Sequence, residues 1–280
     1  MIMKTENMIV GVIERKHLLA LLAEGNRIDG RQKLEVRDFT VEAGLLNKAE
    51  GSAKVQMGNT IVYAGVKASL GSPFPDTPNQ GVLIVNIELS PLASPYFESG
   101  PPRPDAIELS RVCDRGLRES HVINVDDLCE VPGEKVWIVF VDIYPVADDG
   151  NLLDASSLAA MAALATTKLP VVTVDPETKV VTTNADETKP LPINRFSSSV
   201  TFSKVGDDFV VDPVLAEEKI EDVRFTVGIT TDEAGNPIIS ALQKSLSGSF
   251  TRDEIHKMLD IATPLGVERI AKLREKLGLS

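Results

Sequence analysis

Apolar and polar residues alternate with a period of two along several short segments, which is the pattern of half-buried β-strands. One group of these segments lies early in the chain and another lies late. The expected strands are residues 34–41, 52–57, 60–68, 82–89, 197–203, 208–211, 224–231 and 237–242. Gly58-Asn59, between the second and third strands, is typical of a hairpin turn. The nearly continuous apolar run Val136–Val146 indicates one more strand, covered on both faces.

Helical periodicity separates these strands and ends the chain. Met8–Ala23 is amphipathic, and the charged residues within it argue against a signal peptide. Asp105–Ser120 carries one apolar stripe, and the alanine-rich segment Ala155–Lys168 is small enough to pack closely against a sheet. We expect Asp154 to be the N-cap of the alanine-rich helix and a capping box at Thr251–Glu254 to open the last helix.

The order of the elements predicts an α+β fold of two similar halves. Strands precede a helix, a strand and a helix, and the order of strands followed by a helix then recurs, without the strict alternation of a doubly wound sheet. Residues 173–192 show little periodicity, and we interpret them as a long connection between the two halves in which a short hairpin can form. We divide the chain into an N-terminal helical extension (1–26), a first half (27–185) and a second half (186–280).

Composition and charge narrow the classes of function. With 43% hydrophobic and 25% charged residues the chain has the composition of an ordinary soluble protein. Two cysteines and three scattered histidines predict neither a disulfide framework nor a metal site, so we expect a cytoplasmic protein without metal or cofactor. The net charge of −12 opposes nucleic-acid binding at long range. Contact with RNA would need a local concentration of arginine, or partner chains.

The segment Asp105–Ser120 offers such a concentration. Arg111, Arg115 and Arg118 stand at i, i+4 and i+7, within an arc of about 60° on a helix. Three guanidinium groups in a row can bind successive phosphates. The residues alone nevertheless favour a solvated helix face, since Asp114 can pair with Arg118 one turn away.

Three charged segments could be functional, but their residues favour structural roles. Asp148–Asn151 together with Asp154 could hold magnesium, or the helix start could bind an anion, but three carboxylates there would repel phosphate. We interpret this segment as a polar turn followed by an N-cap. The acidic run 217–222 could include a general acid but is typical of a solvated loop. Arg27–Arg31 forms a charged turn in which Gly30 allows a positive φ.

Three segments in order resemble the RNase PH superfamily: Arg27–Arg31 (RIDGR), the hairpin region Gly51–Gly81, and Glu98–Ser120. The resemblance covers nearly the whole chain after Asn26. Within the superfamily it is strongest to the non-catalytic ring subunit of the archaeal exosome, on the leading helix and on Ala106–Leu109 before the arginine row. It implies the two-half RNase PH fold, which is similar to that of ribosomal protein S5 domain 2.

The resemblance also implies partners and a process. A catalytic sister subunit would alternate with this chain in a ring of three heterodimers, and a trimer of RNA-binding cap proteins with S1/KH or zinc-ribbon domains would cover one face. Such a complex would degrade single-stranded RNA from its 3′ end by phosphorolysis. Arg111, Arg115 and Arg118 would then lie on the RNA path and hold the phosphate backbone, with Arg115 as the first candidate.

Two departures from active members imply that this chain is not the catalyst. Active members carry a Gly-Thr-Arg phosphate-binding turn where this chain has Gly150-Asn151-Leu152, so the guanidinium and hydroxyl partners of the attacking phosphate are missing. They also carry an aspartate at the start of a strand in the second half. Counting without gaps from Asp212 places Arg224 there, whereas a shift of one or two residues would bring Asp222 to that position.

Three functions remain open. The first is a non-catalytic ring subunit that structures the active site of its sister and helps to bind RNA. The second is an active phosphorolytic 3′–5′ exoribonuclease, which Leu152 disfavours. The third is a purely structural ring spacer, which the net charge of −12 favours.

Overall fold

The computed structural model describes residues 11–175 and 181–279. The described helices are α1 (Val12–Ala23), α2 (Pro104–Glu119), α3 (Leu152–Ala165), α4 (Leu215–Ile220) and α5 (Arg252–Lys276), with a 3₁₀ turn at Val125–Leu128. The described strands are β1 (Phe39–Ala43), β2 (Gly51–Met57), β3 (Thr60–Gly71), β4 (Val82–Ile87), β5 (Cys129–Val131), β6 (Lys135–Ala147), β7 (Lys168–Val174), β8 (Val181–Pro190), β9 (Ser197–Val205), β10 (Asp208–Val211), β11 (Val223–Thr231) and β12 (Pro237–Ser245). No helix within the described ranges is both long enough and apolar enough to cross a membrane.

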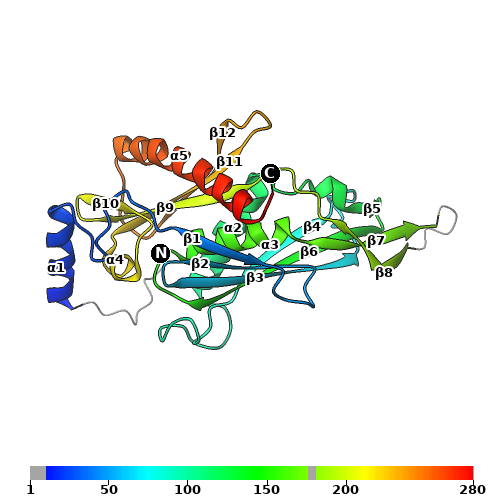
Figure 1. Cartoon of the computed structure of the whole chain (residues 1–280), viewed down its shortest axis with the longest axis horizontal. Helices are drawn as coiled ribbons and strands as arrows, with labels where there is room; N and C mark the ends of the chain where they lie inside the picture. Colours follow the sequence, from blue (N-terminus) through cyan, green and yellow to red (C-terminus); the bar gives the residue numbers. More distant parts are fainter. Residues whose placement is uncertain (1–10, 176–180, 280) are drawn as a thin grey trace.

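The strands form a large sheet in the first half and a smaller sheet in the second half (Figure 1). The first sheet has the order β1-β2-β3-β6-β4, with β5 beside β6. Its β4–β6 pair is parallel and its other pairs are antiparallel. The second sheet has the order β10-β9-β11-β12 and is antiparallel. This arrangement confirms the predicted α+β fold of two halves.

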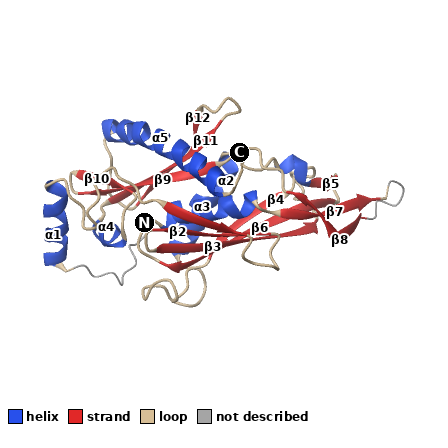
Figure 2. Cartoon of the chain, in the orientation of Figure 1, coloured by secondary structure: helices blue, strands red, loops and turns tan. Residues whose placement is uncertain are grey.

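Helices α2 and α3 lie between the two sheets, and α5 covers the outer face of the second sheet (Figure 2). The Ser199 hydroxyl of β9 donates to Ser157 of α3 (3.1 Å), while the neighbouring Ser198 donates to the Gly266 carbonyl of α5 (2.9 Å). Because successive residues of a strand point to opposite faces, α3 and α5 lie on opposite sides of β9. Helix α3 is itself enclosed, since its residues Leu152–Leu164 are all buried.

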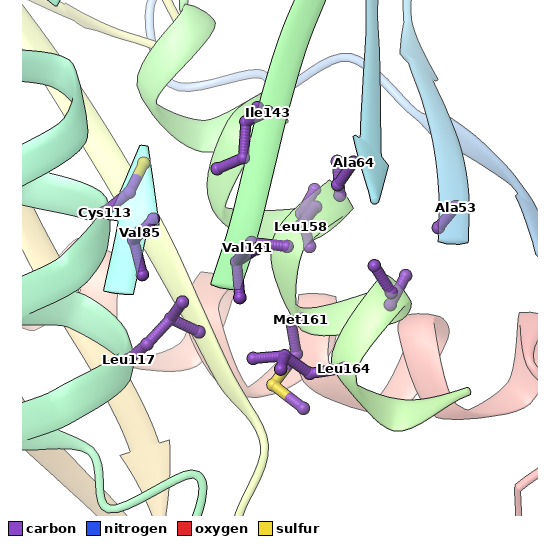
Figure 3. Close-up of a cluster of buried hydrophobic side chains, with 14 of the residues drawn as sticks. Ala53, Ala64, Val85, Cys113, Leu117, Val141, Ile143, Leu158, Met161 and Leu164 are labelled. Carbon is purple, nitrogen blue, oxygen red and sulfur yellow. The ribbon is translucent and has the colours of Figure 1, made fainter. Parts of the chain in front are cut away.

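The main hydrophobic core lies between the first sheet and the two inner helices (Figure 3). Side chains from α2, β4, β6 and α3 meet in it, and many are small, as the alanine-rich helix predicted. Helix α3 and the turn after it approach the sheet closely at Gly51 of β2. A Cβ on Gly51 would lie 2.1 Å from Thr167 Oγ1 and 2.4 Å from the Ala163 carbonyl oxygen. Glycine at this position therefore sets the distance between helix and sheet.

The N-terminal helix α1 packs on the second half of the molecule. Leu18 and Leu22 are almost fully buried against Val205, Val210 and Ile220. The helix predicted for this region is confirmed over residues 12–23, and positions 8–10 lie outside the described residues.

Two predicted segments differ from the structure. The strand expected at 34–41 begins only at Phe39, because the backbone before it binds the second half. There the Val211 amide donates to the Lys33 carbonyl, and the Arg37 amide donates to the Asp212 carboxylate. Segment 173–192 holds the hairpin that the expected connection allowed, but strand takes up more of it than we expected, since β7 ends at Val174 and β8 spans Val181–Pro190. The division between residues 185 and 186 falls within β8 and stays a prediction.

We expect Gly51→Ala to lower the free energy of unfolding by about 1–3 kcal/mol, the usual effect of overpacking a core. The matched control is Gly65→Ala in β3, where the one contact within 4 Å of the added Cβ would be Leu46 Cδ1 at 3.7 Å. Chemical denaturation of both variants measures the difference. Equal stability of the two variants would contradict the close approach of α3 to β2.

Candidate functional site

A buried ionic network joins the two halves at the start of α3. Asp154 is fully buried, and its carboxylate accepts hydrogen bonds from Arg269 Nη1 of α5 (2.6 Å) and Thr201 Oγ1 of β9 (2.7 Å). The prediction that Asp154 caps this helix is wrong, because its carboxylate is occupied by these partners from the second half. The N-cap is Asn151, in the left-handed conformation (φ 58°), whose side chain accepts from the Asp154 amide.

Asp212 is the second centre of this network. Its buried carboxylate accepts from Arg31 Nη1 (2.8 Å), Arg37 Nη2 (2.7 Å) and Asn151 Nδ2 (2.7 Å). The same Nδ2 of Asn151 also donates to Asp154 (2.8 Å), so one side chain links both carboxylates. Burial by itself would raise the pKa of Asp212, but the hydrogen bonds and charge of Arg37 outweigh burial and hold this pKa well below its usual range.

The acidic run at residues 217–222 is not the solvated loop that we expected. The run begins within helix α4, and Glu217 is almost completely buried. Its carboxylate makes a bidentate ion pair with buried Arg27, with N–O distances of 2.6 and 2.8 Å. The buried guanidinium group requires this partner, since an unpaired charge at such a position would be costly. The turn Arg27–Arg31 therefore anchors the start of the first half onto the second.

A second carboxylate of this run reaches the turn Gly150–Leu152. The backbone amide of Asn151 donates to Glu218 Oε1 (3.0 Å), and Arg224 Nη2 lies 3.4 Å from the same oxygen. The start of α3 and a guanidinium group thus bind a carboxyl group of the chain itself at a place where a helix start can hold an outside anion. Leu152 adds no polar group here, because its side chain is buried in the main core.

Negative charge dominates around this turn. Arg224 also pairs with Glu221 (2.6 Å), and the charge of Asp148 acts on both Glu218 and Arg224. Burial is the main cause that raises the pKa of Glu218 to about 7; Arg224 lowers it, and Glu221 and Asp148 raise it further. Burial disfavours the charged form of Arg224, but Glu218 and Glu221 outweigh burial and raise the pKa of Arg224. A phosphate ion would therefore meet carboxylates at this turn.

Arg224 faces the turn, whereas Asp222 points elsewhere. The Asp222 carboxylate accepts from the Gly206 amide (2.7 Å) and pairs with Arg15 of α1 (3.2 Å). The chain thus brings Arg224 beside the start of α3 and Asp222 to the contact with α1.

The three arginines singled out in the sequence lie together on the exposed side of α2. Arg111, Arg115 and Arg118 are all exposed, and with the edge strand β4 they line a groove of about 420 Å³, which we call the arginine groove. Arg118 is the least available of the three. Its Nη2 donates to the Leu83 carbonyl of β4 (2.8 Å) and pairs with Asp114 (2.7 Å).

The other two arginines have more freedom. Arg115 Nη1 donates to Gln243 of β12 (2.6 Å), a neutral partner at the surface. Arg111 makes no hydrogen bond or ion pair with any residue that the structure describes. The groove therefore offers two guanidinium groups that carry no charge partner of their own.

The ionic network was not predicted, although two of its members carry a signal in the sequence. Arg269 lies on the buried stripe of α5 beside Ile270, and Asp154 lies in a helix of mostly apolar residues. A charged residue on a buried face requires a partner. Asp212 and Arg37 carry no such signal, because their pairing depends on how the two halves meet.

The two α+β halves form a two-domain protein. Buried charges at the start of α3 join the two domains, and the turn Gly150–Leu152 at this junction is polar. Comparison with known proteins agrees: residues 35–170 match domain 1 of the 3′ exoribonuclease family (RNase PH), and residues 196–263 match domain 2. The chain belongs to this family, and the superfamily inferred from the sequence is confirmed.

Individual relatives show which branch of this family the chain resembles. The chain is 47% identical over 274 residues to exosome complex component Rrp42 of Thermococcus kodakarensis, covering 98% of this chain and 99% of that protein. It is 44% identical over 272 residues to the protein of that name from Methanothermobacter thermautotrophicus, covering 97% of each. These matches confirm the resemblance to the archaeal exosome branch.

Solved structures agree with the sequence relatives. One is a chain of the Archaeoglobus fulgidus exosome with RNA bound to the active site, with a TM-score of 0.81 and 44% identity over 94% of this chain and 97% of that one. Another belongs to an archaeal exosome core, with a TM-score of 0.77 and 41% identity over 95% of this chain and 96% of that one.

The raised pKa of Glu218 predicts how the stability of the folded chain depends on pH. The unfolded chain releases this proton near the ordinary value of 4.5, whereas the folded chain retains it to about 7. The resulting contribution to stability is complete below the unfolded value and is lost as the pH rises through the folded value. We expect Glu218→Gln to remove this loss, so that its free energy of unfolding falls less between about pH 5 and pH 7 than that of the wild type.

Urea denaturation at several pH values measures this difference. Glu233→Gln is the control, because it makes the same chemical change at an exposed glutamate outside the junction. A Glu218→Gln profile that coincides with the wild-type profile would show that this carboxyl group titrates alike in the folded and unfolded chains.

Proposed function

We propose that this chain is a non-catalytic ring subunit of an archaeal exosome, which structures the active site of a catalytic sister subunit and helps to bind RNA. The observation that carries the proposal is the state of the turn Gly150–Leu152. The Asn151 amide is taken by the chain's own Glu218, and Leu152 is buried in the core. Inorganic phosphate, the nucleophile of phosphorolysis, would therefore meet Glu218 at the Asn151 amide and would find no unpaired guanidinium group there.

The charge at the position that we align with the catalytic aspartate supports the same proposal. Arg224 lies there, and both Glu218 and Glu221 hold its proton in place. A guanidinium group that stays protonated cannot exchange a proton with a leaving group. This chain would then lack both the anion site and the proton donor of a phosphorolytic enzyme.

The arginine groove supports a role in holding RNA. Arg111 and Arg115 project from one side of α2 and are free of carboxylate partners among the described residues, so each can bind a phosphate group. Arg118 is the weaker candidate, because Asp114 neutralises it. Contacts of this kind position an RNA strand without reading its sequence.

The similar proteins suggest the assembly. The relatives are named exosome components, and one similar structure is described as holding RNA at its active site. We therefore propose a ring of three heterodimers with the catalytic sister subunit, covered by a trimer of cap proteins with S1/KH or zinc-ribbon domains and acting on single-stranded RNA. A cytoplasmic location fits the free thiols of Cys113 and Cys129.

One set of observations favours a ring spacer that never touches RNA. The net charge is −12, and Arg115 and Arg118 already have partners within the chain. The salt dependence of RNA binding separates this function from the proposed one.

The purified chain should release no nucleoside diphosphates from RNA at any phosphate concentration, because its turn 150–152 cannot hold the attacking anion. Leu152→Arg should not restore activity, since Arg224 would remain at the aligned catalytic position. Chromatography of the reaction products measures the release, with the complex of this chain and its sister as the positive control. Phosphate-dependent shortening of RNA by this chain alone would contradict the proposal.

Arg115→Ala in the assembled ring should weaken RNA binding by about 1–3 kcal/mol, the scale of a charge-assisted hydrogen bond to phosphate. Each lost contact with a single strand should also make the dependence of log affinity on log salt shallower by about 0.7. The double variant Arg111→Ala/Arg115→Ala should lose more affinity than either single variant. RNA affinity at several salt concentrations, in rings of confirmed size, measures both effects.

Arg252→Ala provides the matched control, because this arginine is exposed at the start of α5, on a different element. It removes the same charge and should change RNA affinity little. If the double variant behaved like this control in affinity and in salt dependence, the arginine groove would be a solvated surface and the spacer function would be preferred.

A further inference from the structure

A pocket of about 300 Å³ lies at the N-terminal end of α2. Its walls come from the end of β4 and from the loop that leads into α2. The apolar part of its lining consists of Ile87, Leu89, Phe97, Pro101, Pro102 and Ala106. Its charged part consists of Glu88, Glu98 and Asp105 with a single arginine, Arg103. We call this the acidic pocket.

The acidic pocket carries an excess of negative charge. Arg103 pairs with Glu98, and neither Glu88 nor Asp105 forms a salt bridge within residues 11–175 and 181–279. Burial raises the pKa of Asp105 and the charge of Glu108 raises it further, while the charges of Arg103 and Arg224 lower it in part. A positive group in this pocket would offset both effects.

The shape and chemistry of the pocket suit a long basic side chain. Apolar walls match the methylene groups of lysine or arginine, and carboxylates match the charged end. The loop already attracts one cation of the chain itself, because Lys219 Nζ lies 5.4 Å from the centre of the Tyr96 ring. The Tyr96 ring at the edge of this pocket therefore already contacts one positive charge.

The position of the pocket indicates where such a side chain would come from. The pocket adjoins residues 86–89 and the arginine groove adjoins residues 83–85, so the two lie end to end along β4. Helix α2 runs antiparallel to this strand. Near the end of β4, the Ile87 amide donates to Ser110 Oγ of α2 (2.9 Å). Near the start of β4, Arg118 of α2 donates to the Leu83 carbonyl.

The same seam between β4 and α2 also exposes apolar side chains. Ile84 of β4 is 39% exposed, and Ile107 of α2 is 45% exposed one turn before Arg111 on the same side of the helix. The seam thus has an acidic end, apolar residues and a basic end. A basic side chain of a neighbour that packs along this seam would complement the acidic end.

We infer that the acidic pocket receives an arginine or lysine side chain from the neighbouring catalytic subunit, and that this contact helps to fix the β4–α2 seam as a ring interface. The inference rests on the proposed function, because it requires such a neighbour. It also explains how a chain of net charge −12 can bind a partner through the same face that carries its exposed arginines.

The test is the affinity of this chain for the purified catalytic sister subunit at several salt concentrations. The pocket variant is the double change Glu88→Gln/Asp105→Asn. The matched control is Glu42→Gln/Glu268→Gln, which removes the same two charges from exposed positions on β1 and α5. At low salt the pocket variant should bind the sister subunit roughly tenfold more weakly than the control, and the difference should shrink as salt rises.

Glu88→Lys is a second test of the inference, for the case that Asp105→Asn disturbs the start of α2. This single change lies on an exposed position and should weaken association more than Glu88→Gln does, because it places a positive charge where one is expected to arrive. If the wild-type ring forms and all pocket variants bind the sister as the control does, the inference is overturned and the proposed function stands. If the wild-type chain does not associate with the sister at all, both are overturned.

Discussion

Two buried carboxylates and the cations around them hold the halves of this molecule in a single arrangement. Asp154 lies at the start of α3 in the first half, Asp212 lies after β10 in the second, and the Asn151 side chain donates to both. Arg269 and Arg37 neutralise them from opposite halves. Removing one partner of such a pair costs about 3–5 kcal/mol, because the remaining charge stays buried without compensation. The geometry of the junction therefore depends on this network more than on any one apolar contact.

The network also explains why the turn before α3 is closed to outside anions. With its side chain engaged by two carboxylates, Asn151 is held in the left-handed conformation and keeps its backbone amide directed at Glu218. Glu218 is in turn held by Arg224, whose guanidinium group is shared with Glu221. The helix start has the geometry to bind an anion, but its Asn151 amide is bound by a carboxyl group of the same molecule. A binding site can thus be lost by internal occupation while its backbone geometry persists.

Charge is distributed unevenly over a chain that is acidic as a whole. The seam between β4 and α2 has three arginines with Asp114 and Glu119 at one end and three carboxylates with Arg103 at the other, so its local field differs from that implied by the net charge of −12. Screening limits the reach of surface charges to roughly 10 Å at moderate ionic strength, so a ligand in the arginine groove responds mainly to the residues that line it. An RNA strand and a protein neighbour can therefore use adjacent parts of one face.

The sequence by itself determined the long helices, most strands of the two larger sheets, the two-half α+β fold and the family, but not α4, β5 or β8. Periodicity sufficed because a helix enclosed like α3 must be apolar whatever encloses it, and because helical geometry alone places Arg111, Arg115 and Arg118 on one side of α2. Only the tertiary structure decided which charges meet. Glu217 and Glu218 belong to a run that is typical of a solvated loop, yet both find cationic partners at the junction. Such pairing depends on which residues, distant in sequence, are buried together, and no local sequence pattern shows this.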